Sequence, residues 1–330
     1  MSNAKRNIII ITFIIVITVI PSSVFAQAPG LDLTVSPVFF DYAAKPGDTI
    51  KDKIRIRNNT SAPIPLKIEI QKIGPDKNGA LAIQEPKPDD VHLGWIKFDS
   101  ATVSARPKEW SDINFTLSIP QDAAFGYYMA ISVKSDGQAT TGNTAAVTGE
   151  AAIPILLNVK KDGAKVEGKL TEFKPKNFIN EYLPVEFDLS VANTGNVHIR
   201  PRGNIFLSGP GIKDLGLLDV NADLGAVLPG ATRFFTSKWT DGFLTSDDGH
   251  LNAHWDKLTH FRIGPYNASI LLVFDNGTRD VTLDGKTTFW ILPYKLIGLT
   301  LGVILAIIFI TRWLLKAYVK AQIKKQKVVE

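Results

Sequence analysis

Apolar and polar residues alternate along much of the chain between residues 31 and 288. In the clearest stretch, residues 50–57, isoleucines and Asp52 fall on one face of the expected strand, and lysines and arginines on the other. Because successive side chains of a strand point to opposite faces of its sheet, this alternation predicts one largely apolar face and one basic, solvated face. The same reasoning predicts strands over residues 65–70, 112–119, 127–133 and 152–159.

The second half of the chain repeats this organisation. No stretch between residues 31 and 288, called the ectodomain below, shows a long helical period. Clusters of Gly, Pro, Asn and Asp separate the expected strands, as turns require. Strands are predicted over residues 183–191, 199–207, 233–239, 266–274 and 278–289. About seven short strands per domain are typical of an immunoglobulin-like sandwich. The sequence therefore predicts an all-β ectodomain of two immunoglobulin-like β-sandwich domains in tandem, at residues 27–160 and 161–288.

Two anchors indicate that the halves are related by duplication. Asn58 ends an expected strand before a turn, and Asn193 does the same 135 residues later. A Gly-x-Tyr-x-Ala motif begins at Gly126 and again at Gly264, an offset of 138, and each copy opens an apolar strand. In a strand, the Tyr and the Ala of each copy share one face. We therefore expect the two motifs to occupy equivalent positions in two related domains.

The N-terminus has the features of a secretory signal peptide. Lys5 and Arg6 precede thirteen residues, 8–20, that are apolar except for two threonines. The small residues that follow fit cleavage after Ala26. Thirteen apolar residues are too few to span a bilayer comfortably, which takes about 20. We expect residues 1–26 to be removed; cleavage after Ala28 and an uncleaved anchor are the alternatives.

A second apolar run, residues 289–311, contains one charge, Lys295, and is long enough to cross the hydrocarbon core as a helix. Trp and Tyr flank it at both ends, as in membrane-spanning helices. The tail, residues 312–330, carries six Lys or Arg and one Glu. The positive-inside rule places this tail in the cytoplasm, in contact with anionic lipid, and the ectodomain outside. The expected localisation is the cell membrane, with a single transmembrane helix.

This topology changes the meaning of the net charge of +5. Lys5 and Arg6 contribute +2, and Lys295 with the tail contributes +6, which leaves −3 for the exported part of the chain. A mildly acidic ectodomain gives no support for nucleic-acid binding, and none is expected. The chain has no cysteine, so its domains must fold without disulfides. That absence favours a bacterial surface over an animal one.

The sequence shows no set of residues typical of catalysis. Without cysteine there is no thiol nucleophile and no Cys-ligated zinc. No nucleophile elbow, phosphate-binding glycine loop or His-Glu-x-x-His motif occurs. The acidic pairs at 89–90 and 247–248 lie in loops flanked by Pro or Gly, where solvated turns are expected. We therefore predict neither an enzyme nor a bound cofactor.

The most unusual stretch of the ectodomain is residues 241–260. Pro107 corresponds to Pro229, 122 residues later, whereas Gly126 corresponds to Gly264, 138 residues later. The difference indicates an insertion of about 16 residues before the second Gly-x-Tyr-x-Ala motif. Three of the five histidines fall within this stretch, together with several carboxylates.

Two functional hypotheses concern this insertion. His250 and His254 would share a face if the stretch were helical, and with Asp247 they are candidate metal ligands. The insertion is alternatively a partner-binding surface formed by His250, His254, Trp255 and Asp256, because long loops on rigid scaffolds often carry recognition. An ordinary polar loop whose Trp255 packs on the sandwich is the third reading.

Small residues recur along one face of the expected membrane helix. Gly298, Gly302 and Ala306 are four residues apart, a spacing that allows two helices to pack closely. Self-association into a homo-oligomer through this face is therefore a hypothesis.

The layout of signal peptide, two sandwiches, one span and a Lys-rich tail resembles the WxL-interacting surface proteins of Gram-positive bacteria. The first domain also looks similar to PapD-like chaperone and major-sperm-protein sandwiches. The stretches that carry the resemblance are residues 36–37, 46–48, 58–59, 193–203 and 290–295. The chain departs from the family at residues 126–128, which read Gly-Tyr-Tyr where the family has a Gly-Gly-containing strand. The resemblance implies attachment at the cell wall, with the two domains binding peptidoglycan or partner proteins.

These observations lead to a main hypothesis and two alternatives. The main one is a non-enzymatic, membrane-anchored cell-surface protein whose tandem domains bind a cell-wall polymer or a surface protein. The first alternative is a membrane-tethered assembly chaperone that acts by strand addition. The second is a metal-binding surface protein that uses the insertion at 241–260.

Overall fold

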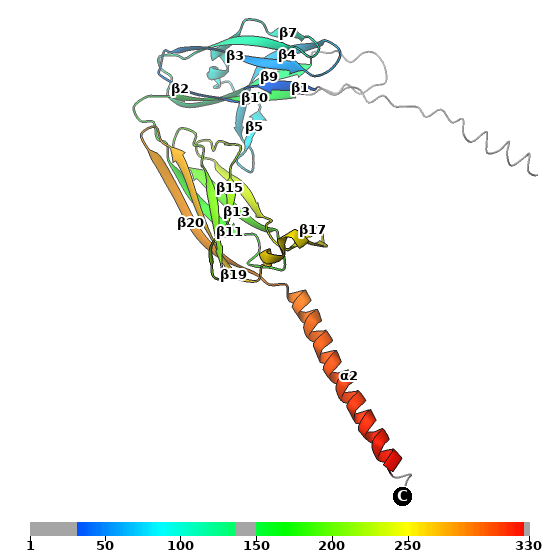
Figure 1. Ribbon diagram of the computed structural model, residues 1–330. Coiled ribbons are helices and arrows are strands. Elements are labelled where there is room, and N and C mark those ends of the chain that lie inside the picture. Colours follow the sequence, from blue (N-terminus) through cyan, green and yellow to red (C-terminus); the bar gives the residue numbers. More distant parts are fainter. Residues whose placement is uncertain (1–31, 136–149, 327–330) are drawn as a thin grey trace, which may run out of the picture.

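The computed structural model describes residues 32–135 and 150–326, with side chains up to residue 319. The expected signal peptide, residues 1–26, lies outside the described residues. Two β-sandwiches follow one another along the chain, and one long helix leaves the far end of the second (Figure 1). The two immunoglobulin-like sandwiches and the C-terminal helix predicted from the residue pattern are confirmed.

The first sandwich packs a β1-β3-β8-β6 sheet against a β2-β10-β9-β4-β5 sheet, with β7 paired to β4. β2 runs parallel to β10, and the other pairs are antiparallel. The elements are β1 (Leu33–Ser36), β2 (Phe40–Ala44), β3 (Thr49–Asn58), β4 (Ile64–Pro75), β5 (Leu81–Gln84), the 3-10 helix η1 (Val91–Trp95), β6 (Ile96–Phe98), β7 (Thr102–Ala105), β8 (Trp110–Ser118), β9 (Phe125–Ser135) and β10 (Glu150–Val159).

The second sandwich packs a β11-β13-β16 sheet against a β12-β20-β19-β14-β15 sheet. A separate hairpin, β17 with β18, and the 3-10 helix η2 lie between β16 and β19 in the chain. The elements are β11 (Gly168–Pro175), β12 (Ile179–Asn180), β13 (Val185–Asn193), β14 (Arg202–Gly209), β15 (Ile212–Val220), β16 (Thr232–Trp239), β17 (Leu244–Asp247), β18 (His250–Ala253), η2 (Trp255–His260), β19 (Gly264–Asp275), β20 (Asp280–Ile291) and the helix α2 (Tyr294–Gln326).

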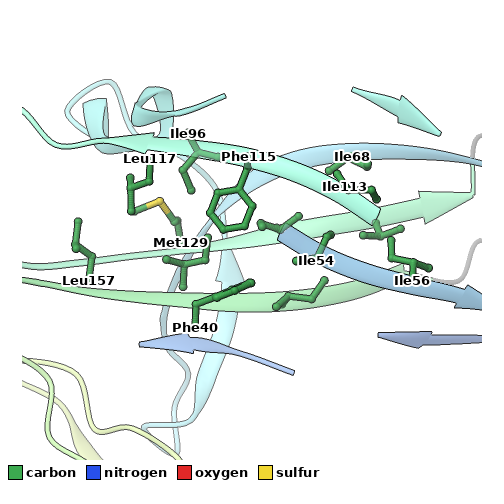
Figure 2. Close-up of a cluster of buried hydrophobic side chains, with 14 of the residues drawn as sticks. Phe40, Ile54, Ile56, Ile68, Ile96, Ile113, Phe115, Leu117, Met129 and Leu157 are labelled. Carbon is green, nitrogen blue, oxygen red and sulfur yellow. The ribbon is translucent and has the colours of Figure 1, made fainter. Parts of the chain in front are cut away.

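The alternation in β3 determines which of its side chains enter the first core. Ile54 and Ile56 are fully buried, while the basic residues between them face solvent. Ile54 pairs with Ile113 of β8, and Phe115 continues the same buried face across the sheet (Figure 2). Burial of one such side chain contributes about 1.5–3 kcal/mol, so this face is a major source of the stability of the sandwich.

Aromatic rings dominate the second core. Phe187 and Phe289 meet edge to face with their centroids 5.2 Å apart, and Trp239 meets Tyr266 at 5.5 Å. All four rings are buried. The rings come from β13, β20, β16 and β19, so their contacts join the two sheets of the sandwich.

The first pair of repeat anchors, Asn58 and Asn193, has the same structural role in both sandwiches. Each is buried, donates from Nδ2 to two backbone carbonyls, and accepts at Oδ1 from the backbone N–H two residues later. The partners are Ala62, Ala105 and Thr60 for Asn58 (2.7, 2.9 and 2.9 Å), and Val197, Val227 and Gly195 for Asn193 (2.8, 2.8 and 2.9 Å). Each amide therefore fixes a strand end and satisfies backbone groups that would otherwise be buried without partners.

The second anchor is not equivalent in the two sandwiches. Tyr266 lies in the second core, whereas Tyr128 lies on the outer face of β9, because Tyr127 and Met129 are the residues that point into the first core. The residue that matches Tyr266 is Tyr127. The Tyr127 hydroxyl accepts a hydrogen bond from the backbone N–H of Ala124, and the Tyr266 hydroxyl donates one to the carbonyl of Ile263, in both cases three residues earlier. The offset of 138 is therefore wrong by one residue, and an odd shift exchanges the two faces of a strand.

The membrane helix begins at Tyr294 and not at residue 289 as the apolar run predicts. Phe289 and Ile291 belong to β20 and are buried in the second core. Pro293 then ends the extended backbone, and α2 follows directly. The stretch from Tyr294 to Val319 is 26 residues long, with a mean hydropathy of 2.2, and is able to cross a membrane by length and composition.

Candidate functional site

The predicted insertion is present as a separate subdomain of the second sandwich. Residues 240–263 join β16 to β19, whereas residues 119–124 make the equivalent connection between β8 and β9. The extra residues form β17, β18 and η2. Two backbone contacts attach the hairpin to the sandwich: Ser246 N–H donates to the Leu183 carbonyl at 2.6 Å, and Leu183 also bridges Thr245.

The structure separates the candidate metal ligands of this insertion. His250 starts strand β18 and pairs with Asp247 across the hairpin, and His254 precedes η2, so the helical spacing assumed for the two histidines is absent. His254 Nε2 lies 2.9 Å from the Thr245 hydroxyl. Within residues 32–135 and 150–326, no three His, Cys, Asp or Glu side chains gather in a group that could hold a metal ion.

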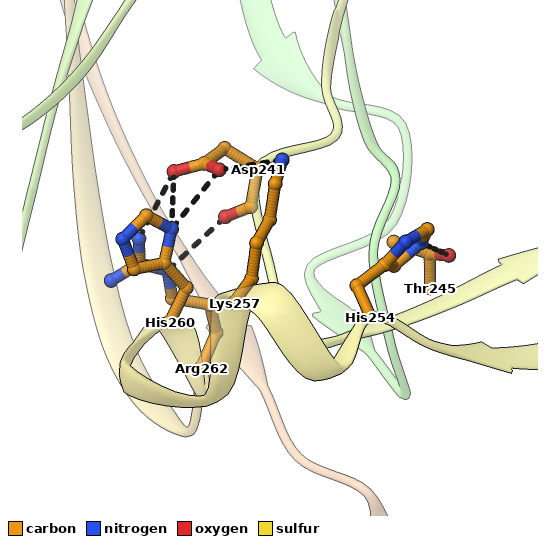
Figure 3. A network of polar contacts seen from close by, with 6 residues as sticks. All are labelled: Asp241, Thr245, His254, Lys257, His260 and Arg262. Atoms are coloured by element: carbon orange, nitrogen blue, oxygen red, sulfur yellow. Dashed lines mark hydrogen bonds and ion pairs between the residues drawn. The ribbon is translucent and has the colours of Figure 1, made fainter.

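The polar network of the insertion forms around Asp241, a residue that sequence reasoning did not single out (Figure 3). Its carboxylate lies 3.0 Å from Lys257 Nζ, 3.0 Å from His260 Nδ1 and 3.3 Å from Arg262 Nη2. Burial acts to raise the pKa of Asp241, but the hydrogen bonds and charges of Lys257 and His260 outweigh it and lower that pKa. The network joins η2 to the two ends of the insertion, where it follows β16 and precedes β19, and Arg262 also lies over the ring of Trp239 in β16, 5.6 Å from its centroid. Its role is therefore to hold η2 against the base of the insertion.

The two other candidate partner-binding residues of the insertion lie in η2. Trp255 is 72% exposed, and its ring meets that of Phe243, also in the insertion, edge to face with the centroids 5.5 Å apart. Asp256 is exposed in the first turn of η2. No residue of η2 is buried. The assignment of His250, His254, Trp255 and Asp256 as a partner-binding surface stays a prediction.

The small-residue face of α2 is open in the described chain. A side-chain methyl at Gly298 or Gly302 would meet no atom within 4 Å, and the surrounding helix is exposed throughout. Helix packing through Gly298, Gly302 and Ala306, and lipid contact by the basic tail, stay predictions.

A second polar cluster lies where the two sandwiches meet. Asp41 of β2 lies 3.1 Å from His198 Nε2 and 3.3 Å from Arg200 Nε, both from the second sandwich. The Arg200 guanidinium also lies over the Phe39 ring, 4.2 Å from its centroid. Burial acts to raise the pKa of Asp41, but the hydrogen bond and charge of His198, with the charge of Arg200, hold that pKa below its ordinary value.

Tyr128 adds a second bond across this junction. Its hydroxyl accepts a hydrogen bond from the His198 backbone N–H at 2.9 Å, and its ring meets the imidazole edge to face at 5.7 Å. Burial raises the pKa of Tyr128 well above its usual range, so the hydroxyl stays protonated. The outward-facing Tyr that breaks the repeat therefore serves the contact between the sandwiches.

An apolar cluster and a hairpin tip complete the junction. Ile73 and Leu156 of the first sandwich pack against Leu228 of the second, with small alanines between them. The β4–β5 tip reaches the edge of β16, where Phe234 N–H donates to the Asn78 carbonyl at 3.0 Å. Apolar contact together with charge pairing and backbone bonding holds the two sandwiches in one arrangement, which Figure 1 shows as an angle between them.

Beside Asp41 the junction encloses a cleft of about 560 Å³, which we call the junction cleft. This volume lies within the range of about 300–1,000 Å³ typical of ligand sites. Its polar lining includes Asn158, Lys160, His198, Arg200, Arg202 and Asp275. Neither Lys160 nor Arg202 has an ion-pair partner among the described residues, whereas Asp41 is already paired.

Three buried polar atoms of the cleft residues lack a hydrogen-bond partner within the described chain. They are Asn158 Oδ1, His198 Nδ1 and Arg200 Nε, of which the last lies at ion-pair distance from Asp41. Unpaired buried polar atoms are uncommon, because each one loses its bonds to water without replacement. The cleft therefore offers unpaired positive charge and unsatisfied polar atoms to a ligand.

Sequence reasoning did not find this cleft. Asp41 and His198 are 157 residues apart in the chain, so no local pattern brings them together. The signal for the junction in the sequence is the pair of successive tyrosines at 127–128, because only one of two neighbouring residues in a strand faces its own core.

Comparisons with known proteins give no family. No protein-family model and no curated protein matches the chain. Among solved structures, it is similar to the class 5 fimbriae chaperone CfaA, at 12% identity and a TM-score of 0.39, over 79% of this chain and 100% of that one. It is also similar to the Pseudomonas aeruginosa CupB2 chaperone, at 12% identity and a TM-score of 0.37, over 76% of this chain and 98% of that one. For the E. coli chaperone DraB the identity is 10% and the TM-score 0.37, over 80% of this chain and 98% of that one. At such low scores these likenesses carry no argument about function.

Proposed function

We propose that the chain is a non-enzymatic, membrane-anchored cell-surface protein that binds a partner in the junction cleft. In this proposal α2 crosses the cell membrane, the two sandwiches lie outside and the basic tail lies in the cytoplasm. The observation that carries it is the cleft itself, whose walls come from both sandwiches and are held together by the Asp41 cluster.

The chemistry of the cleft favours an anionic ligand. Among the described residues, Lys160 and Arg202 form no ion pair, and they outnumber the one carboxylate of the lining that is likewise without an ion pair, Asp275. Asn158 and His198 supply unsatisfied polar atoms. Arginine in particular recognises carboxylate and phosphate groups through its planar donors. An acidic segment of a surface protein and an anionic cell-wall polymer both carry such groups. These are the two partner classes that the sequence predicts.

The resemblance to WxL-interacting surface proteins supports the same proposal. It places the ectodomain at a bacterial cell wall, where both partner classes occur. No family model matches the chain, so the family stays a hypothesis.

A double variant of the cleft tests this function. The full chain in nanodiscs is immobilised and incubated with cell-wall fractions and surface-protein extracts of the source cells. We expect Lys160→Glu with Arg202→Glu to lower capture at least about tenfold, because two unpaired cations become anions. The control, Lys51→Glu with Lys97→Glu, makes the same charge change on the outer face of the β3 sheet and should leave capture unchanged. Equal losses in both variants would show that net charge, and not the cleft, determines binding.

Strand addition is the second candidate, and the free edge of β20 favours it. β19 pairs with β20 along its whole length, but on the other edge β12 pairs only with Trp290 and Ile291. Within the described residues, 280–289 form no hydrogen-bonded ladder on that edge, beside which β11 lies close. A client strand that enters next to β11 would pair with these backbone groups. In the first sandwich, the outermost strands β1, β2, β5 and β6 have only three to five residues each.

Hydrogen exchange distinguishes the two candidates. If a client strand adds to β20, backbone amides within residues 280–289 that exchange rapidly in the free chain become protected when surface-protein extract is added. Protection confined to the cleft residues would reject strand addition at this edge and support the cleft.

A further inference from the structure

The insertion between β16 and β19 exposes apolar side chains that the sandwich does not use. Trp255 and Leu258 of η2 are 72% and 56% exposed, and Leu251 of β18 and Phe261 are also exposed. An element with no buried residue gives little stability to the domain that carries it. A group of exposed aromatic and aliphatic side chains instead indicates contact with another surface.

The position of the insertion identifies that surface. Phe261 and Leu244 line one small cavity together with Ile291 and Pro293, the residues that lead directly into α2. Figure 1 shows the β17 hairpin at the end of the second sandwich from which α2 leaves. Of the apolar elements in the ectodomain, this one therefore lies beside the entry to the membrane.

The connection to α2 keeps this end of the sandwich at the bilayer surface. Only Leu292 and Pro293 separate β20 from α2, and Leu292 N–H donates to the Asn180 carbonyl at 2.8 Å. Lys295, in the first turn of α2, forms an ion pair with Glu181 at 2.7 Å. Since a charged pair stays out of the hydrocarbon, Lys295 marks the level of the headgroups. A linker this short leaves no room for the insertion to stand away from the lipid.

We propose that the insertion rests on the outer leaflet, with Trp255 and Leu258 in the interfacial region of the bilayer beside α2. Tryptophan is enriched at this level because its ring is apolar and its N–H is polar. The Asp241 network, which joins Lys257 and His260 of η2 to the start of the insertion directly after β16, sets the orientation of η2 for this contact. The inference rests on the proposed membrane anchoring and adds a second membrane contact to it.

The contact is apolar in origin. Residues 241–263 contain four Asp against one Lys and one Arg, so attraction to anionic lipid does not contribute. We therefore expect binding to zwitterionic phosphatidylcholine, with little dependence on salt. Such a contact would limit rotation of the ectodomain about the start of α2.

Site-specific labelling tests this contact, because the natural chain has no cysteine. Leu258→Cys is labelled with a fluorophore, and the full chain is reconstituted in phosphatidylcholine vesicles with and without phosphatidylcholine that carries a doxyl quencher near the headgroup. Val91→Cys is the matched control, since Val91 is 69% exposed in η1, the 3-10 helix of the first sandwich. Leu305→Cys lies about 15 Å along α2 from Lys295, near the middle of the bilayer, and reports the anchor with a doxyl group placed near the end of the acyl chain instead.

We expect doxyl lipid to reduce fluorescence of the label at position 258 at least about twofold and to leave position 91 unchanged. A label at 258 as unquenched by lipid as the label at 91 would overturn the inference while quenching at 305 leaves the anchor intact. Loss of quenching at 305 as well would reject the anchor. Iodide, a quencher dissolved in water, provides one more outcome. If the label at position 258 is shielded from iodide but is not quenched by doxyl lipid, the proposed lipid contact is overturned and the covering surface is protein.

A double variant checks which side chains make the contact. In a chain with Leu251→Cys as the label, Trp255→Ser with Leu258→Ser should remove most of the quenching by doxyl lipid. Because neither side chain is buried, the fold is expected to persist. Unchanged quenching in this variant would contradict the assignment to η2.

Discussion

The two sandwiches of the ectodomain agree in their interiors and differ at their surfaces. Asn58 and Asn193 make the same three bonds at the end of corresponding strands, and Tyr127 and Tyr266 both form a hydrogen bond with the backbone three residues earlier. A common interior with different surfaces is expected where packing fixes the core while binding acts on the exterior.

The surface differences fall at the two ends of the second sandwich. At the junction, Tyr128 and Asp41 on the surface of the first sandwich contact His198 of the second. Tyr266, the tyrosine of the second sandwich, lies instead in its core. At the membrane end, the second sandwich carries the insertion at 240–263 where the first has six residues. The proposed ligand site and the proposed lipid contact therefore lie at opposite ends of the second sandwich.

The largest expected effect tests the shared interior. Asn58→Ala and Asn193→Ala should each destabilise its own sandwich by about 2–4 kcal/mol, because each leaves two buried carbonyls and one N–H without a partner. Urea unfolding followed by fluorescence measures the effect, with Trp95 and Trp110 in the first sandwich and Trp239, Trp255 and Trp290 in the second. A loss below about 0.5 kcal/mol in one of them would break the equivalence of the two interiors.

A smaller effect is expected at the junction. Asp41→Asn should weaken the coupling of the sandwiches by about 1–2 kcal/mol, since Asp41 is partly exposed and solvent screens its ion pairs. Spin labels at Val91→Cys in the first sandwich and Leu217→Cys in the second measure the distribution of distances between the two sandwiches, which should become broader. The control, Asp112→Asn on the outer face of the first sandwich, should leave this distribution unchanged.

The same labels test a dependence on pH. The pKa of Asp41 is held below its ordinary value of 3.8 in the folded chain, so its contribution is present above that value and is lost as the pH falls through the lowered pKa. The distribution should therefore broaden only below about pH 3.8 in the natural chain and stay broad at every pH in Asp41→Asn. Broadening of both chains at the same pH would contradict this role.

The smallest effect separates the two adjacent tyrosines. Tyr128→Phe removes the acceptor of the His198 N–H and should weaken coupling by about 0.5–1 kcal/mol. Tyr127→Phe, its neighbour in the first core, should leave coupling unchanged and alter only the stability of the first sandwich. If both variants affect the distance distribution equally, the outward assignment of Tyr128 is wrong.

Local pattern was enough to predict the fold. Ile54 and Ile56 alternate with charged residues, and that period alone predicts the strand and its buried face. The start of α2 was misplaced because Phe289 and Ile291, buried in a strand, adjoin the apolar helix without a polar break. The repeat was misaligned because two tyrosines in succession fit the same motif, and composition does not show which one faces the core.

The cleft and the insertion depend on contacts between distant segments. Asp41 and His198 belong to different sandwiches, so only the relative placement of the two brings them together. The insertion was located from its spacing, but its structure was not: His250 lies in a strand, and Asp241, which anchors η2, was not among the candidates. One sequence contains no periodic signal for either arrangement.

Photo-cross-linking in the source cells tests the central claim that the junction cleft holds a partner. A photoreactive phenylalanine analogue replaces Leu224, which lines the cleft and leaves Lys160 and Arg202 in place, or Lys51 on the opposite face of the first sandwich as the control. We predict a covalent adduct to one defined surface protein or anionic wall polymer from position 224 and none from position 51; no adduct from position 224 would contradict the account. The same adducts from both positions, or an adduct from position 51 alone, would contradict the account.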